Sequence, residues 1–143
     1  MKKILIDCDT GIDDSLAILY ALKSKSLHIE GITTGFGNTG ALQAAENVLR
    51  LIQLANPGYE IPVATGAEET LLGKKEDYPI HIHGKSGLGD VELPKSNQVL
   101  SKESAWEMIV RKAGEMPGEL TLVTLGRLTN LAKALELDPK LPQ

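Results

Sequence analysis

Four aspartates within eight residues, directly after a short apolar run, constrain this chain more than any other feature. The acids are Asp7, Asp9, Asp13 and Asp14. The apolar run predicts a short buried strand over Lys2 to Asp7, and the pattern from Asp13 to about Lys23 predicts a helix. The acids therefore lie at the carboxyl end of a strand, which is where open α/β sheets bind their ligands.

This acidic loop needs a partner for its charge. Carboxylates held this close raise one another's pKa values and repel, unless a cation or several hydrogen-bond donors share the charge. The ligands on offer are oxygens, because alternation along the strand turns the side chain of Cys8 away from Asp7 and Asp9. The loop therefore predicts a hard divalent cation, with calcium a better fit than magnesium.

A purely structural interpretation accounts for only part of the cluster. Asp13 can be a helix N-cap, and Asp14 can be a first-turn acid that complements the helix dipole. Asp7 and Asp9 stay unexplained. A calcium-binding helix-loop-helix is excluded, because Gly11 stands where that motif wants Asp or Asn and because the segment follows a strand.

The segment Asp7-Cys-Asp-Thr-Gly-Ile-Asp-Asp14 resembles the amino-terminal signature of the inosine-uridine nucleoside hydrolase family. Three further blocks follow in family order, at residues 31–38, 83–89 and 120–130. The resemblance implies a Rossmann-like α/β fold, with a mostly parallel sheet flanked by helices. Residues 1–143 would then be the amino-terminal part of a single α/β domain, and we expect an incomplete fragment of that fold.

The implied reaction is hydrolysis of the N-glycosidic bond of a ribonucleoside, which gives ribose and a free base. Carried over position by position, the resemblance makes Asp9 both a calcium ligand and the general base. Asp14 matches a bidentate metal carboxylate, and Leu125 would offer its backbone carbonyl. Asp7 matches a supporting acid that either touches the metal or acts from behind it.

The resemblance also implies residues that contact the substrate. Asp13 and Asn38 match residues that bind ribose hydroxyls, and His83 matches a site histidine. Taken alone, an Asn after Gly is often a turn residue and a loop histidine is often solvated, with His81 as a nearby competitor. Lys85 departs from the family pattern, which usually has an acid after the His-Gly pair.

The rest of the chain alternates predicted strands and helices, which implies parallel βαβ units. The strands are expected at Leu27–Thr34, Ile61–Thr65 and Leu120–Thr124. The helices are expected at Thr39–Ala55, Lys102–Gly114 with Ser101 as N-cap, and Leu131–Leu137. The apolar faces are expected to include Leu16 in the first helix and Leu42 in the second. Residues 66–100 lack periodicity, and their Gly-rich block predicts a mobile loop over the site or a disordered excursion.

Composition narrows the partners and the compartment. The chain has 42% apolar and 24% charged residues and a net charge of -4, which argues against nucleic acid and anionic membranes as partners. A lone cysteine and the short apolar run before Asp7 predict a cytoplasmic protein. The family resemblance implies a small nucleoside substrate, a part in purine or pyrimidine salvage, and a homo-oligomer, either a dimer or a tetramer.

Two other functions stay open at this stage. One is a magnesium-dependent phosphohydrolase of the haloacid dehalogenase type with Asp7 as nucleophile, although that family expects Thr or Val in place of Gly11. The other is a non-catalytic ribose- or nucleoside-binding domain. Since the family's further metal ligand and leaving-group acid would lie downstream, we expect these 143 residues alone to bind calcium weakly and to turn over no nucleoside. The preference between purine and pyrimidine is not predicted.

Overall fold

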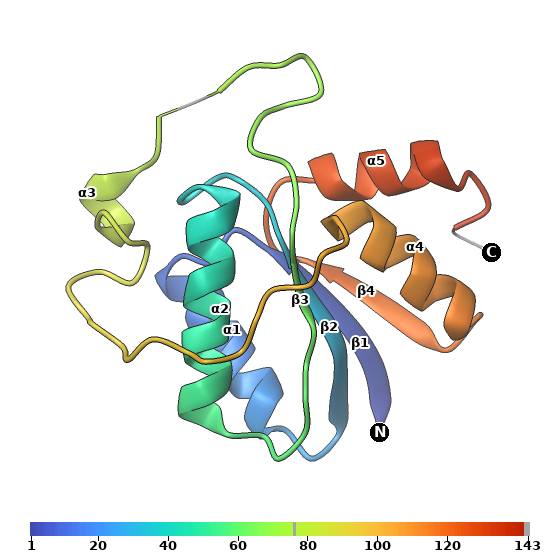
Figure 1. Ribbon diagram of the computed structural model, residues 1–143, viewed down its shortest axis with the longest axis horizontal. Helices are drawn as coiled ribbons and strands as arrows, with labels where there is room; N and C mark the ends of the chain where they lie inside the picture. Colours follow the sequence, from blue (N-terminus) through green and yellow to red (C-terminus); the bar gives the residue numbers. More distant parts are fainter. Residues whose placement is uncertain (76, 142–143) are drawn as a thin grey trace.

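The computed structural model describes residues 1–75 and 77–141, which form a four-stranded sheet covered by helices on both faces (Figure 1). The strands are β1 (Lys2–Cys8), β2 (Leu27–Thr34), β3 (Val63–Thr65) and β4 (Leu120–Thr124). They lie in the order β3-β2-β1-β4, and all three neighbouring pairs are parallel. This confirms the predicted α/β class.

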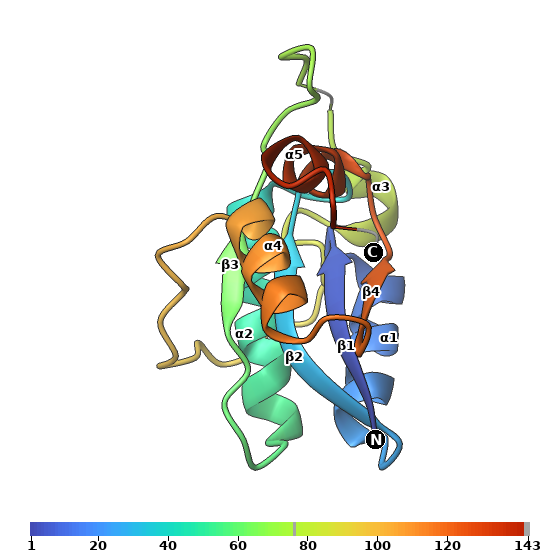
Figure 2. The ribbon, with the colours of Figure 1, turned by 90° about the vertical axis from the view of Figure 1, so that its right-hand side faces the viewer.

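The helices divide between the two faces of the sheet. They are α1 (Ile12–Lys23), α2 (Ala41–Ala55), α3 (Ile80–His83), α4 (Ala105–Glu115) and α5 (Thr129–Leu137). Helices α1 and α2 cover one face, and α4 and α5 cover the other (Figures 1 and 2). Ile4, Ile6 and Cys8 of β1 point into the first core, whereas Leu5 points into the second with Met108. Successive side chains of a strand point to opposite faces, so a central strand buried on both sides contributes to both cores.

One expected helix cap is wrong, and the alternative interpretation of Asp13 as a cap is also wrong. Helix α4 begins after Ser104 rather than Ser101, because only Ser104 has a Glu three residues later and so completes a capping box. The Ser104 side chain accepts from the Glu107 amide, and the Glu107 carboxylate accepts from the Ser104 amide. Helix α1 begins one residue before Asp13, with Gly11 at the N-cap, so Asp13 lies in the first turn and is not a cap.

The predicted apolar faces were partly wrong. Leu42 and Leu16 are 54% and 67% exposed, because each helix buries only the stripe that faces the sheet. In α2 that stripe runs through Ala41, Ala44 and Val48, and it also includes a fully buried amide, Asn47. No helix in the described ranges is long and apolar enough to cross a membrane.

The chain between β3 and α4 passes through α3 and then returns along α2 and β3, where Arg50 donates to the Leu93 carbonyl and the Ser101 amide donates to the Val63 carbonyl. Its only helix among the described residues is the single turn α3, which the sequence pattern did not predict. The following turn contains three glycines with positive φ, Gly84, Gly87 and Gly89. The glycine density of this block therefore serves a tight turn that other residues adopt only with strain.

Candidate active site

The predicted acids lie where the carboxyl ends of β1, β2 and β4 meet. Asp7 is level with Thr33 of β2 and with Thr124 of β4. Beyond these pairs, the Leu125 amide donates to the Asp7 carbonyl and the Gly35 amide donates to the Cys8 carbonyl. The acidic loop is therefore held between the loops that follow β2 and β4.

Asp7 is buried and held by donors from the protein itself. Its Oδ1 accepts a hydrogen bond from the Thr33 hydroxyl at 2.6 Å and one from Asn130 Nδ2 at 2.9 Å. Burial raises the pKa of Asp7 to about 6, although these two hydrogen bonds oppose the rise. The two donors occupy one carboxylate oxygen, so this acid suits a supporting role better than that of an exposed nucleophile.

Asp9 and Asp14 form a pair of neighbouring carboxylates, and each accepts a hydrogen bond from a backbone amide. Asp14 Oδ2 accepts from the Asp9 amide at 3.0 Å, and Asp9 Oδ2 accepts from the Asn38 amide at 2.8 Å. Both side chains are buried. Burial and the adjacent Asp9 carboxyl raise the pKa of Asp14 well above its ordinary value. Two neighbouring buried carboxylates that disfavour each other's charge provide a favourable place for a cation.

The donor set around this pair is oxygen-rich but incomplete. Gly126 follows Leu125, and a Cβ built on Gly126 would lie 3.1 Å from Asp9 Oδ1, so the β4 loop runs directly past Asp9. Within residues 1–75 and 77–141, no group of three or more Asp, Glu, His or Cys side chains is placed to hold a metal ion. Asp13 is exposed on the first turn of α1.

His83 and Asn38 are brought to the acidic loop from two distant segments. His83 Nδ1 accepts a hydrogen bond from the Ile12 amide at 3.0 Å. A Cβ on Gly11 would lie 2.6 Å from His83 Nδ1 and 2.7 Å from Asn38 Nδ2, so both side chains pack against that glycine. His81 is exposed and makes no such contact with the loop among the hydrogen bonds of the described residues.

Asn130 is a site residue to which the sequence analysis assigned no role. Its Nδ2 donates to Asp7 Oδ1 and to the Thr34 carbonyl, and its Oδ1 accepts from the Ala67 amide at 2.9 Å. One buried amide thus joins the ends of β1, β2 and β3. The available signal was a polar residue inside the last of the four blocks that resemble the family, at a position that a helix packed on a sheet buries.

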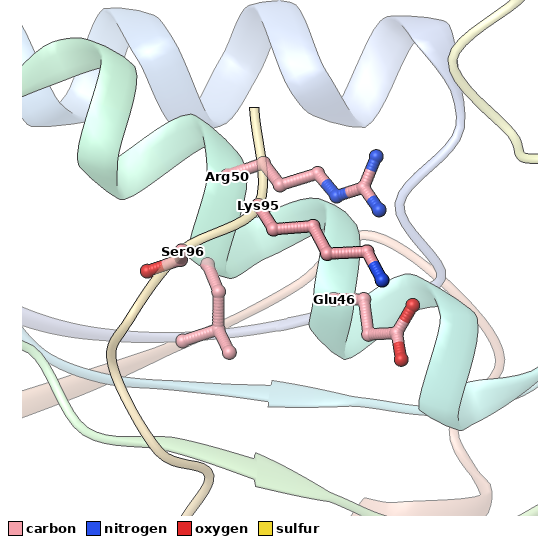
Figure 3. A pocket seen from close by; sticks show the side chains of 5 residues that line it. Glu46, Arg50, Lys95 and Ser96 are labelled. Atoms are coloured by element: carbon pink, nitrogen blue, oxygen red, sulfur yellow. The ribbon is translucent and has the colours of Figure 1, made fainter. Parts of the chain in front are cut away.

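Two neighbouring hollows lie on the outer side of α2. The first, of about 200 Å³, is lined by Glu46, Leu49, Arg50, Lys95 and Ser96. In it, Arg50 and Lys95 extend in the same direction (Figure 3). The second, of about 860 Å³, shares these two cations and is also lined by His81, Lys85, Asp90 and Glu92. Neither hollow is lined by an acid of the loop, so the candidate site does not coincide with either of them.

Comparison with known families decides between the functional classes. The profile described as "Inosine-uridine preferring nucleoside hydrolase" matches residues 4–143. The chain belongs to this nucleoside hydrolase family. The alternative assignment, a magnesium-dependent phosphohydrolase of the haloacid dehalogenase type, is therefore wrong.

Individual relatives agree with this assignment. The chain is 46% identical over 138 residues to "Uridine nucleosidase 1" of Arabidopsis thaliana. The aligned region covers 96% of this chain and 40% of the relative. It is 36% identical to "Pyrimidine-specific ribonucleoside hydrolase RihA" of Escherichia coli, over 96% of this chain and 44% of that one. The chain thus spans less than half the length of the curated relatives it matches.

Solved nucleoside hydrolases share the fold. A plant nucleoside hydrolase superposes with a TM-score of 0.92 at 40% identity, over 98% of this chain and 44% of that one. The purine-preferring ribonucleoside hydrolase from Gardnerella vaginalis gives the same TM-score at 35% identity, over 98% and 45%. The sheet and helices described above therefore correspond to a little under half of these longer folds.

Proposed function

We propose that this chain supplies the metal- and ribose-binding part of an enzyme that hydrolyses the N-glycosidic bond of ribonucleosides. The observation that carries the proposal is the pair of buried carboxylates, Asp9 and Asp14, at the meeting point of three strand ends, with Asn38 and His83 packed beside them. The family match gives the reaction class.

The residues present fit a hard cation. Burial and mutual repulsion disfavour the charged state of the Asp9–Asp14 pair, and a cation would relieve both. The ligand atoms are oxygens, which calcium prefers. Asp9, Asp14 and the Leu125 carbonyl would hold the ion, and Asp7 would support the loop from behind. A bound calcium ion would lower the pKa of a water molecule at this site.

The side chains of this chain have distinct tasks in the proposed reaction. Asp9 accepts the proton of the attacking water, and its negative charge stabilises the positive charge that develops on the sugar. Asp13 and Asn38 bind ribose hydroxyls and so orient the anomeric carbon toward that water. His83 packs against Gly11 beside Asn38. Because Nδ1 accepts from the Ile12 amide, the neutral imidazole carries its proton on Nε2.

The decisive experiment is a chimera in which this chain replaces the matching segment of Arabidopsis uridine nucleosidase 1. We expect the chimera to release base and ribose from a nucleoside in the presence of calcium, and the unfused 143-residue chain to release none. Uridine and inosine should both be assayed, because the matched proteins include pyrimidine-specific and purine-preferring enzymes. The intact plant enzyme is the positive control.

Each result of this experiment has a defined meaning. A folded chimera that binds ribose but releases no base would favour a non-catalytic binding domain and refute the proposal. Turnover by the unfused chain would refute the expectation that the downstream part of the fold is needed. Chelation with EDTA followed by addition of calcium or magnesium in turn identifies the metal.

The proposal also includes a metabolic role, a cellular compartment and an oligomeric state. A nucleoside hydrolase that returns bases and ribose to the cell would serve purine or pyrimidine salvage, and the buried thiol of Cys8 is compatible with a reducing cytoplasm. We also propose that the functional form is a homo-oligomer, a dimer or a tetramer. Light scattering on the purified chimera and on the unfused chain measures this directly.

A further inference from the structure

One fully buried amide, Asn47 in the middle of α2, has no part in the chemistry described so far. Its neighbours along the buried stripe are apolar, among them Ala44, Val48 and Leu51. An amide buried among apolar side chains destabilises a fold unless its polar atoms are hydrogen-bonded. The partners of Asn47 therefore show what the residue contributes.

Asn47 hydrogen-bonds two loops that are far apart in the sequence. Its Nδ2 donates to the Ser86 carbonyl at 2.6 Å and, through a longer contact of 3.4 Å, to the Thr10 carbonyl. Its Oδ1 accepts from Gln43 Nε2, one helical turn earlier, at 3.1 Å. Thr10 belongs to the acidic loop, and Ser86 belongs to the turn that follows His83.

The packing at this point is close. Gly87 has a φ of +88°, and a Cβ built on it would lie 2.9 Å from the Thr10 carbonyl oxygen and 3.1 Å from Asn47 Nδ2. The turn thus passes directly over the acidic loop, and only a glycine fits there. The turn also closes on itself, because the Gly89 amide donates to the His83 carbonyl at 2.7 Å.

The two loops meet at a second point, where His83 Nδ1 accepts from the Ile12 amide. Asn47 donates to Ser86 of the turn and to Thr10 of the acidic loop. His83 contacts the same loop two residues after Thr10, at Ile12. We propose that Asn47 is a positioning residue: it fixes the turn of residues 84–89 on the acidic loop and so holds the His83 imidazole against the first turn of α1. The catalytic consequence rests on the function proposed above, whereas the positioning itself does not.

The primary test is made on the 143-residue chain and needs no activity. Asn47→Asp keeps the size of the side chain but places oxygens against the Ser86 and Thr10 carbonyls. At about pH 8.5, where histidine is neutral, the ¹⁵N shifts of His83 in the unchanged chain should show the Nε2-protonated tautomer. In the variant they should move toward a tautomeric average, and the Ile12 amide should exchange about tenfold faster, the effect of losing one buried hydrogen bond.

Val48→Ala is the matched control, because Val48 is as buried as Asn47 and lies on the same helix. The substitution lowers global stability without removing a hydrogen bond of Asn47. After correction for global unfolding, it should change neither readout. If Asn47→Asp does not fold, Asn47→Ala should give the same local changes. The proposal is overturned if the unchanged chain already shows averaged tautomers, if a folded Asn47 variant keeps the His83 shifts, or if Val48→Ala moves them equally.

The functional consequence is tested in the chimera by a double-mutant cycle. Asn47→Asp should lower kcat by about tenfold, and it should have no further effect once His83→Ala is present. Additive effects of the two substitutions would contradict positioning through His83. An inactive chimera would count against the proposed function, and the His83 spectra would still decide the positioning.

Discussion

Asp7 and the Asp9–Asp14 pair lie within eight residues of one another, yet the protein treats their charges in opposite ways. Asp7 receives two hydrogen bonds on one oxygen, from Thr33 and Asn130. The other two acids receive one backbone amide each and face one another's charge. We therefore propose that Asp7 is a part of the scaffold, whereas the Asp9–Asp14 pair binds a cation.

The largest expected effect is on the rate of nucleoside hydrolysis, and it follows from a substitution in the Asp9–Asp14 pair. In the chimera, Asp9→Ala should lower nucleoside hydrolysis by about 10³-fold, because both a general base and a negative charge near the sugar are lost. Initial rates of base release measure this loss. Asp90→Ala, which removes an exposed acid of the neighbouring segment, should leave the rate unchanged. A rate within threefold of the parent, roughly 0.7 kcal/mol, would remove Asp9 from the mechanism.

The second effect concerns pH and the buried state of Asp7. Its pKa in the folded chain, about 6, lies above the ordinary value of 3.8, so the fold binds this proton more tightly than the unfolded chain does. The resulting stabilisation is present below about pH 4 and is lost as pH rises through 6, which amounts to about 3 kcal/mol. Urea unfolding of the chain in EDTA should show this decline, and Asp7→Asn should make it shallower. The raised pKa of Asp14 leaves a part of the decline in both proteins. Equal slopes in both proteins would contradict the assignment.

The third effect is the response to calcium. At a calcium concentration about tenfold above the dissociation constant, the chain should gain about 1.4 kcal/mol of stability. Asp14→Asn should abolish this gain, whereas Asp7→Asn should retain most of it. Thermal unfolding with and without calcium measures both. If Asp7→Asn loses the response as completely as Asp14→Asn, Asp7 is itself a metal ligand and the distinction between the two regions is removed.

The smallest effect tests the hydrogen bonds to Asp7 directly. Thr33→Val removes the 2.6 Å bond while keeping the shape of the side chain, and it should destabilise the chain by about 1 kcal/mol. The calcium response should be unaffected. Chemical denaturation in EDTA and in calcium gives both quantities, with Thr121→Val on β4 as a control that lies at a half-buried strand position. A change in calcium affinity larger than the change in stability would show that Asp7 does more than support the loop.

The strands and the acids were predictable from the sequence because their signal is local. β2 and β4 have the predicted limits, and β1 and β3 differ by only one or two residues at an end. An apolar run followed by acids fixes both the strand and the position of its carboxyl end. Parallel pairing then places the acidic loop beside the loops that follow β2 and β4 without any further information.

The parts that the sequence did not predict depend on tertiary contacts. Asn47 and Asn130 each join segments that lie more than 35 residues apart, and no local pattern specifies such partners. The position of Ser104 as the cap was readable from Glu107, but the nearby Ser101 competes with the same residue type. The exposure of Leu42 follows from how α2 rests on the sheet, which composition alone does not determine.

Gly37 and Gly126 approach Asp9 from the loops after β2 and β4. A Cβ on Gly37 would overlap Asp9 Oδ2, and one on Gly126 would crowd Oδ1. The orientation of the proposed general base is thus maintained by the absence of side chains in two remote segments. In a saturation mutagenesis screen for activity, Gly37 should tolerate as few replacements as Asp9 itself, although it takes no chemical part in the reaction. Mutational intolerance alone would therefore mistake a spacer for a catalyst at this position.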